Sequence, residues 1–232
     1  MTPLEVTINT AAYTLHRPGD LESLWEGMGQ EDLGEDERIP YWVELWPAAI
    51  HLAEWIADNP GRVAGRRCLD LGCGLGLCTC VAAGVSARVV GMDHEWGAVR
   101  YTRHNAGLNG LPEPGAVQMD WRRPAFKPGS FSVVFAADII YEKRFLEPVN
   151  AFLKHVLAPG GKVLLSTPRR QATAESLPWL RSMGWSCQSL SDRRITHGSY
   201  DMRVALWEMR LEYSTHSRSE PGTTKHENGA RQ

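Results

Sequence analysis

One stretch decides the fold of this 232-residue chain: Arg67-Cys68-Leu69-Asp70-Leu71-Gly72-Cys73-Gly74-Leu75-Gly76. A short apolar run ends in an acid, three glycines follow at alternate positions, and the small apolar residues 77–84 can begin a helix. Glycine lets the chain turn sharply and admits a ligand where a Cβ would collide. A strand, a tight turn and a helix start in this order bring a nucleotide-like ligand against backbone amides.

The spacing of the glycines separates two kinds of nucleotide site. A dinucleotide-binding fingerprint reads G-x-G-x-x-G, and its third glycine would fall at Leu77. This chain reads G-x-G-x-G instead, with Asp70 two residues before Gly72. The pattern therefore argues against NAD as the ligand.

Length and composition indicate an ordinary globular protein of one domain with additions. Hydrophobic residues make up 43% and charged residues 22% of the chain. The formal net charge of −2 gives no reason to expect a nucleic-acid-binding surface. The sequence contains no apolar run near the roughly 18 residues that span a membrane, and residues 1–9 do not resemble a signal peptide. We expect a monomeric cytoplasmic protein that binds neither nucleic acid nor membranes.

The five cysteines do not indicate a metal site. Cys73, Cys78 and Cys80 crowd the glycine turn, but paired C-x-x-C units and histidines at ligand spacing are missing from the sequence. We expect no bound metal and interpret the cysteines as small buried thiols in a reducing compartment.

Acidic residues also end the next three predicted strands. Asp93 ends an apolar run 23 residues after Asp70, near the spacing of about 20 expected for a carboxylate that binds ribose hydroxyls. A third run ends in Asp120-Trp121, which could accept a hydrogen bond from adenine and pack its ring. A fourth run, from Phe131, leads into Asp138-Ile139-Ile140-Tyr141. The alternative for each acid is that it caps the following turn or helix.

The periodicity of apolar residues, together with residues that commonly start or end helices, predicts further elements. A helix begins at Pro47, directly after an aromatic cluster in which we interpret Trp42 as a core anchor. Other helices are predicted over 96–108, 147–157 and 174–183, and strands over 162–166, 185–190 and 204–210. A capped helical turn is predicted over 20–25 and an acidic loop over 31–37.

The order and spacing of residues 40–210 resemble the Rossmann-like methyltransferases that use S-adenosylmethionine (SAM), whose motif I reads D-x-G-x-G-x-G. This resemblance implies an α/β fold with a seven-stranded sheet, mostly parallel with an antiparallel last strand, and helices on both faces. It also implies SAM as the cofactor. Carried over by position, the cofactor-binding residues would be Trp46, Asp70, Gly72, Gly74, Gly76, Asp93, Asp120 and Trp121.

Two further features resemble a narrower family, the seven-β-strand protein-lysine methyltransferases of family 16. This group includes the electron-transfer-flavoprotein β-subunit and valosin-containing-protein lysine methyltransferases. The features are the aromatic segment that ends in Trp46-Pro47 and the D-x-x-Y stretch of Asp138 and Tyr141. In that family D-x-x-Y lies at the methyl-transfer site. Because no Asn-Pro-Pro-Tyr stands at this position, methylation of glutamine or DNA bases is disfavoured.

The resemblance implies that Asp138 and Tyr141 are the catalytic pair and line the acceptor channel. Asp138 would attract the ammonium group of a lysine, and Tyr141 would orient it through its hydroxyl or ring. The alternative is that Asp138 caps a turn and Tyr141 packs in the core.

We expect residues 1–40 to be an N-terminal extension, a candidate substrate-side cap, residues 41–211 to be the methyltransferase domain, and residues 212–232 to be a disordered tail. The expected activity is methyl transfer to a lysine of a protein substrate. Two alternatives remain: a small-molecule N-methyltransferase, and a SAM-fold protein that binds a partner without catalysis.

Overall fold

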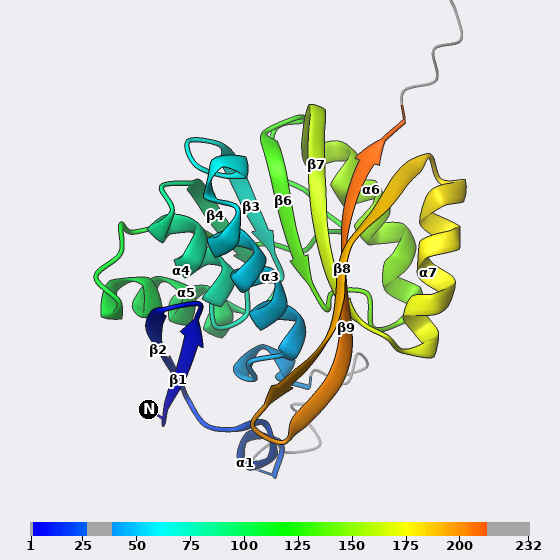
Figure 1. Ribbon diagram of the computed structural model, residues 1–232. Coiled ribbons are helices and arrows are strands. Elements are labelled where there is room, and N and C mark those ends of the chain that lie inside the picture. Colours follow the sequence, from blue (N-terminus) through cyan, green and yellow to red (C-terminus); the bar gives the residue numbers. More distant parts are fainter. Residues whose placement is uncertain (1, 27–38, 213–232) are drawn as a thin grey trace, which may run out of the picture.

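The computed structural model describes residues 2–26 and 39–212, built around one seven-stranded sheet (Figure 1). The strand order is β5-β4-β3-β6-β7-β9-β8. In this sheet β9 runs antiparallel to both of its neighbours, and the remaining neighbouring pairs are parallel. The predicted fold class is therefore confirmed. The strands are β3 (Arg67–Leu71), β4 (Arg88–Asp93), β5 (Gly115–Gln118), β6 (Phe131–Ala137), β7 (Leu157–Pro168), β8 (Trp185–His197) and β9 (Tyr200–Leu211).

Helices cover both faces of the sheet and enclose two hydrophobic cores. One face carries α3 (Pro47–Asp58), α4 (Leu77–Gly84) and α5 (Trp96–Leu108), and the other carries α6 (Leu146–Val156) and α7 (Gln171–Ser182). None of the helices in the described ranges is both long and apolar enough to cross a membrane.

The alternation of side chains along the strands assigns residues to the two cores. Val134 of β6 belongs to the core under α6, and its neighbour Phe135 belongs to the core under α3 and α4. Asp70 lies level with Phe135 in the β3–β6 register, so it occupies a position on the α3–α4 side where its neighbours are apolar. An acid at this buried position needs a functional explanation.

Three strands are longer than the sequence pattern predicted: β7, which extends the predicted 162–166, and the two strands of the last hairpin. The segments 185–190 and 204–210 are parts of β8 and β9, which pair down to a two-residue turn at Gly198 and Ser199. Ion pairs join the added parts of the two strands, Arg194 with Asp201 and Arg203 with Asp192, where apolar residues that would indicate a strand are few. The long hairpin brings its turn to the same edge of the sheet as the carboxyl ends of the parallel strands (Figure 1).

The N-terminal segment forms a hairpin of β1 (Thr2–Ile8) and β2 (Ala11–Arg17) followed by α1 (Leu21–Glu26). Val6, Ile8 and Leu15 belong to the same core as α3 and α4, so the hairpin packs on the main body. The predicted capped turn is confirmed, because the Ser23 amide donates to the Asp20 carboxylate at 2.8 Å. The predicted acidic loop over 31–37 and the predicted tail beyond residue 212 lie outside the described residues.

Two asparagines, Asn105 of α5 and Asn109 directly after it, hold the free edge of β2. Asn105 accepts a hydrogen bond from the His16 amide at 2.8 Å and donates to the His16 carbonyl at 3.2 Å. One turn later, Asn109 makes the same pair of bonds with Thr14, at 3.0 and 2.8 Å. Asn105 is fully buried and also donates to the Leu75 carbonyl at 2.9 Å, next to the glycine turn. The side-chain amides thus satisfy backbone groups that a neighbouring strand would otherwise satisfy.

We predict that Asn105→Ala destabilises the chain by roughly 2–4 kcal/mol, because it leaves buried backbone groups unpaired. The free energy of unfolding from urea titration measures the effect. Asn109→Ala is the matched control and should have a smaller effect, because Asn109 is only half-buried and water can replace it. Equal effects of the two substitutions would contradict the role given to burial.

Candidate active site

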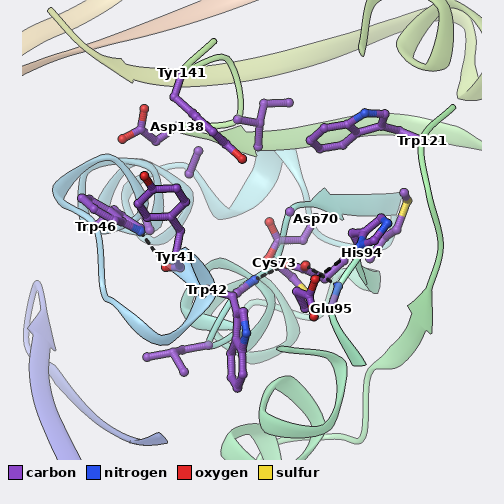
Figure 2. A pocket seen from close by; sticks show the side chains of 18 of the residues that line it. Tyr41, Trp42, Trp46, Asp70, Cys73, His94, Glu95, Trp121, Asp138 and Tyr141 are labelled. Carbon is purple, nitrogen blue, oxygen red and sulfur yellow. Dashed lines mark hydrogen bonds and ion pairs between the residues drawn. The ribbon is translucent and has the colours of Figure 1, made fainter. Parts of the chain in front are cut away.

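A cavity of about 380 Å³ opens at the carboxyl ends of β3, β4 and β6. The chain passes from β3 to β4 on one side and reaches β6 on the other, so this edge is a topological switch point. Open α/β sheets bind their ligands in the crevice at such a point. Figure 2 shows the side chains around the cavity, with Asp70 and Glu95 on one side and Asp138 among aromatic rings on the other.

The glycine turn requires glycine at each of its three positions. Gly72, Gly74 and Gly76 have φ angles of +71°, +52° and +85°, a left-handed region that other residues rarely adopt. A Cβ at Gly76 would lie 2.8 Å from the Cα of Thr102 on α5. At the start of the turn, the Gly72 amide donates a hydrogen bond to the Met92 carbonyl at 2.8 Å, which ties the end of β3 to β4.

Asp93 ends β4 and is held from two sides. One carboxylate oxygen accepts a hydrogen bond from the Gly74 amide and the other from the Glu95 amide, each at 3.0 Å. Burial raises the pKa of Asp93, and the hydrogen bonds from these backbone amides oppose the shift. A carboxylate has about four acceptor positions, so Asp93 keeps capacity for further donors such as ligand hydroxyls.

Asp70 is 2% exposed and accepts a hydrogen bond from the Thr79 hydroxyl at 2.7 Å. Burial raises its pKa to about 6, the Thr79 bond opposes the shift, and the charge of Asp93 adds to it. Within the described ranges, neither Asp70 nor Asp93 forms an ion pair with a lysine or arginine. A buried acid and a half-buried acid without a cation suit a ligand that brings positive charge and hydroxyl donors.

Asp120 and Trp121 follow β5 on the cavity wall. Asp120 accepts hydrogen bonds from the Arg122 amide at 2.8 Å and from its guanidinium at 2.8 and 3.0 Å. Burial acts to raise the pKa of Asp120, but the Arg122 hydrogen bonds outweigh it and hold this pKa below its usual value. The Trp121 ring meets Phe145 edge to face at 5.5 Å.

Asp138 directly follows the last residue of β6 and has a left-handed φ of +51°. Its amide donates to the Ser166 carbonyl at 2.9 Å, and its carboxylate pairs with Arg170 at 3.1 Å. Burial raises the pKa of Asp138, and Arg170 opposes the shift. The carboxylate therefore sits between the cavity and a guanidinium that is 41% exposed.

Aromatic rings line the end of the cavity at Asp138. Tyr141 lies edge to face with Tyr41 at 5.6 Å and with Phe145 at 5.1 Å, and burial raises its pKa to about 12. Trp46 stands directly before α3, with Pro47 as the first helical residue as predicted. Its indole N–H donates to the Tyr41 carbonyl at 2.9 Å. Tyr41, Tyr141 and Trp46 gather around Asp138 in Figure 2.

Trp42 packs on the core, as predicted, and it also lines the cavity. Its ring lies against Tyr101 at 5.7 Å and over Gly97, where a Cβ would come within 2.4 Å of the indole. Trp42 therefore packs against the hydrophobic core and also forms part of the cavity wall.

The structure brings all the residues singled out from the sequence to this one cavity; their roles stay predictions. The sequence reasoning missed Tyr41, Phe145 and Arg170. Tyr41 had a signal, since it belongs to the aromatic segment before α3. Arg170 had none, because it lies 32 residues from its partner Asp138. The residues that line the cavity as expected are Trp46, Asp70, Gly72, Gly74, Gly76, Asp93, Asp120, Trp121, Asp138 and Tyr141.

A comparison with protein families agrees with this geometry. Residues 32–181 match the family described as lysine methyltransferase. This chain belongs to the lysine methyltransferase family. The resemblance that D-x-x-Y and the aromatic segment indicated is thereby confirmed.

Curated relatives of this family member include two lysine methyltransferases. The electron transfer flavoprotein beta subunit lysine methyltransferase of Xenopus laevis is 33% identical over 156 residues, 66% of this chain and 62% of that protein. The protein N-lysine methyltransferase METTL21A of Mus musculus is 28% identical over 128 residues, 53% of this chain and 58% of that protein. The chain thus spans less than two thirds of the length of these relatives.

Solved structures share the fold at low sequence identity. The YcgJ protein of Bacillus subtilis matches with a TM-score of 0.59 and 12% identity, covering 70% of this chain and 99% of that one. This likeness supports the architecture of the sheet and its helices.

The cysteines around the glycine turn are free thiols, and four of the five in the chain are buried, as expected. Burial raises the pKa of Cys73, Cys78 and Cys80 above the usual value of a thiol, so they stay protonated and unreactive. In residues 2–26 and 39–212, no three His, Cys, Asp or Glu side chains are grouped so that they could hold a metal ion.

We predict that Asp70→Asn stabilises the protein without ligand at pH 7 by roughly 1–3 kcal/mol. The pKa of Asp70 is about 6 in the folded chain against the usual 3.8 of an aspartate. The folded state therefore binds the extra proton between about pH 4 and 6, and its stability falls as the pH rises through that window.

Urea unfolding of both proteins at pH 4 and pH 7 tests this expectation. The advantage of the variant should be present at pH 7 and nearly absent at pH 4. A variant that is less stable at pH 7 would contradict it, and would mean that the ionised carboxylate stabilises the turn.

Proposed function

We propose that this protein is a SAM-dependent methyltransferase that transfers a methyl group to a lysine side chain of a protein substrate. The observation that carries the proposal is one cavity with two chemically different ends. Asp70 and Asp93, which form no ion pair within the described ranges, lie beside the glycine turn at one end, and Asp138 with aromatic rings forms the other. Membership of the lysine methyltransferase family supports the same assignment.

The residues at the glycine turn fit SAM. Its ribose offers hydroxyl donors, which suit the remaining acceptor positions of Asp93. Its amino group and sulfonium are positive, which suits the buried carboxylate of Asp70 and the half-buried carboxylate of Asp93. Trp121 and Asp120 would hold the adenine, and Trp46 would pack near the methyl-donating end. When bound, SAM supplies an electrophilic methyl group.

At the other end, Asp138 and Tyr141 would receive the lysine. The Asp138 carboxylate attracts the incoming ammonium, and the surrounding rings provide an apolar channel. A lysine has a reference pKa of about 10.4, so it must lose a proton before it can attack. Desolvation between aromatic rings lowers that pKa, and Asp138 is a nearby acceptor for the proton. Tyr141 stays protonated, because its pKa is about 12, and can donate a hydrogen bond.

Most of the rate would come from positioning, since methyl transfer is an in-line displacement. Tertiary contacts fix the side chains that would position the lysine. Tyr141 is held between Tyr41 and Phe145, and the Asp138 backbone is held by the hydrogen bond from its amide to the Ser166 carbonyl.

The remaining expectations belong to the same proposal. We place residues 1–40 as a substrate-side extension of the methyltransferase domain (41–211) and residues 212–232 as a tail. We expect a cytoplasmic monomer whose partner is its protein substrate and which binds neither nucleic acid nor membrane. Free thiols in all five cysteines fit a reducing compartment.

Incubation with tritiated SAM and a cell lysate tests the reaction class. Label in a protein band that survives as methyl-lysine after acid hydrolysis supports the proposal. Label in a small-molecule fraction supports a small-molecule N-methyltransferase instead. SAM binding without any transfer supports a non-catalytic SAM-fold protein.

We predict that calorimetry detects binding of SAM and its demethylated product but not NAD. Asp93→Ala should weaken SAM binding by roughly 1–3 kcal/mol, because ligand hydroxyls lose their acceptor. Circular dichroism of the variant checks that the turn still folds, since Asp93 also holds Gly74. Tight NAD binding without SAM binding would overturn the cofactor assignment.

We predict that Asp138→Asn lowers methyl transfer by one to a few powers of ten while SAM affinity changes little, each factor of ten being about 1.4 kcal/mol of barrier. The amide keeps the shape and removes the charge that draws in the ammonium. Tyr141→Phe separates the hydroxyl from the ring. Arg170→Gln is the matched control at the same carboxylate: it should keep or raise the rate, because it removes the cation that competes for Asp138.

The rates are compared under single turnover with SAM bound, on a substrate identified by the lysate experiment. Loss of SAM binding in Asp138→Asn would place this acid at the cofactor. Unchanged rates in both Asp138→Asn and Tyr141→Phe would mean that Asp138 only caps a turn and that Tyr141 only packs in the core.

A further inference from the structure

We propose that a second groove, beside the active-site cavity, binds a basic segment of the substrate protein next to the target lysine. The proposal rests on the proposed function and extends it to substrate recognition. The groove encloses about 640 Å³. Its walls come from the hairpin of β1 and β2, from α1, from the turn between β8 and β9, and from the residues just before α3.

The groove and the active-site cavity are joined. Tyr41 and Glu44 line both of them. Tyr41 is 37% exposed and lies edge to face with Tyr141, at 5.6 Å. A chain lying in the groove can therefore direct a side chain past Tyr41 toward Asp138, and a lysine is long enough to reach around a ring.

A row of aromatic rings connects the two spaces, and Figure 2 shows its members Trp46, Tyr41 and Tyr141. Tyr200, in the groove, lies 5.1 Å from Trp46, which lies 6.0 Å from Tyr41. The row continues through Tyr141 and Phe145 into the active-site cavity. Aromatic side chains supply large rigid contact area at interfaces, and Trp and Tyr are enriched there.

The charge of the groove is negative. Asp20, Glu22 and Glu44 line it, against Arg17 and His197. Arg17 is paired with Glu44 at 2.5 Å. Burial lowers the pKa of His197, which favours its neutral form, and the charge of Glu44 opposes the shift. The remaining carboxylates, Asp20 and Glu22, are exposed and lack an ion-pair partner among the described residues.

The negative charge of the groove determines which class of partner can bind there. Acidic side chains repel nucleic-acid phosphates and attract lysine and arginine. Trp25 on α1 is 41% exposed at the groove and provides an apolar contact for the stem of a basic side chain. Glu44 fixes this wall, because its carboxylate also accepts the Leu21 amide at the start of α1 at 2.9 Å.

The test uses two fluorescein-labelled peptides of twelve residues, each with one central lysine. One carries arginines beside the lysine and the other carries glutamates. Binding to the full chain is measured by fluorescence anisotropy in the presence of demethylated SAM. Transfer of tritium from SAM to each peptide and to lysate proteins is measured separately.

We expect the basic peptide to bind at least about tenfold more tightly than the acidic one, with the difference shrinking as salt is raised. Glu22→Arg should reduce this preference by about fivefold. Its control, Glu113→Arg, changes another exposed acid, which lies outside the groove and pairs with Arg103, and should leave the preference unchanged. Trp25→Ala should weaken both peptides, whereas Trp96→Ala, at another exposed tryptophan, should not.

Several results would overturn the groove proposal: no peptide binding, equal binding of both peptides, or a preference that Glu22→Arg leaves intact. An RNA oligonucleotide that binds more tightly than the basic peptide would also overturn it. So would a dimer in sedimentation that Glu22→Arg dissociates, since the groove would then hold a second copy of the chain.

The two proposals fail in different ways. Binding that depends on Glu22, with no label in any peptide or lysate protein, would retain the groove and overturn lysine methylation. Labelled lysine with binding insensitive to Glu22 and Trp25 would retain the activity and overturn the groove.

Discussion

The hydrogen bond between the Gly74 amide and the Asp93 carboxylate is the contact on which the active site depends. It joins the turn after β3 to the end of β4, so the two neighbouring strands present their acids at fixed positions. The turn can make this bond only because its glycines adopt left-handed backbone angles. Asn105 supports the same turn from α5 through the Leu75 carbonyl.

Burying a carboxylate in the site destabilises the folded chain, and a role in binding a ligand explains why the acids lie there. Asp70 lies among apolar residues on the α3–α4 side of the sheet, and its raised pKa reports the unfavourable burial of its charge. Asp138 adds a left-handed backbone at a residue that is not glycine, which costs roughly 1–2 kcal/mol. Such strain gathers at functional sites, where the surrounding structure holds it in place.

The aromatic side chains give the site its shape and link it to the surface. The rings from Tyr200 to Trp121 come from four separate parts of the chain, yet each lies within 6.0 Å of the next. Rings packed edge to face keep fixed orientations, so the channel beside Asp138 is preorganised. A preorganised channel suits a reaction whose rate depends on positioning.

The sequence by itself determined the sheet, the glycine turn and the acids Asp70, Asp93 and Asp138, because these are local patterns and the carboxyl ends of parallel strands meet at one edge. It did not determine the full length of β8 and β9, which ion pairs between the strands stabilise. Only the tertiary structure decided that Arg170 pairs with Asp138 and that Tyr41 joins the cavity to the groove. Those contacts join residues distant in sequence, and side-chain periodicity carries no information about which distant residues meet.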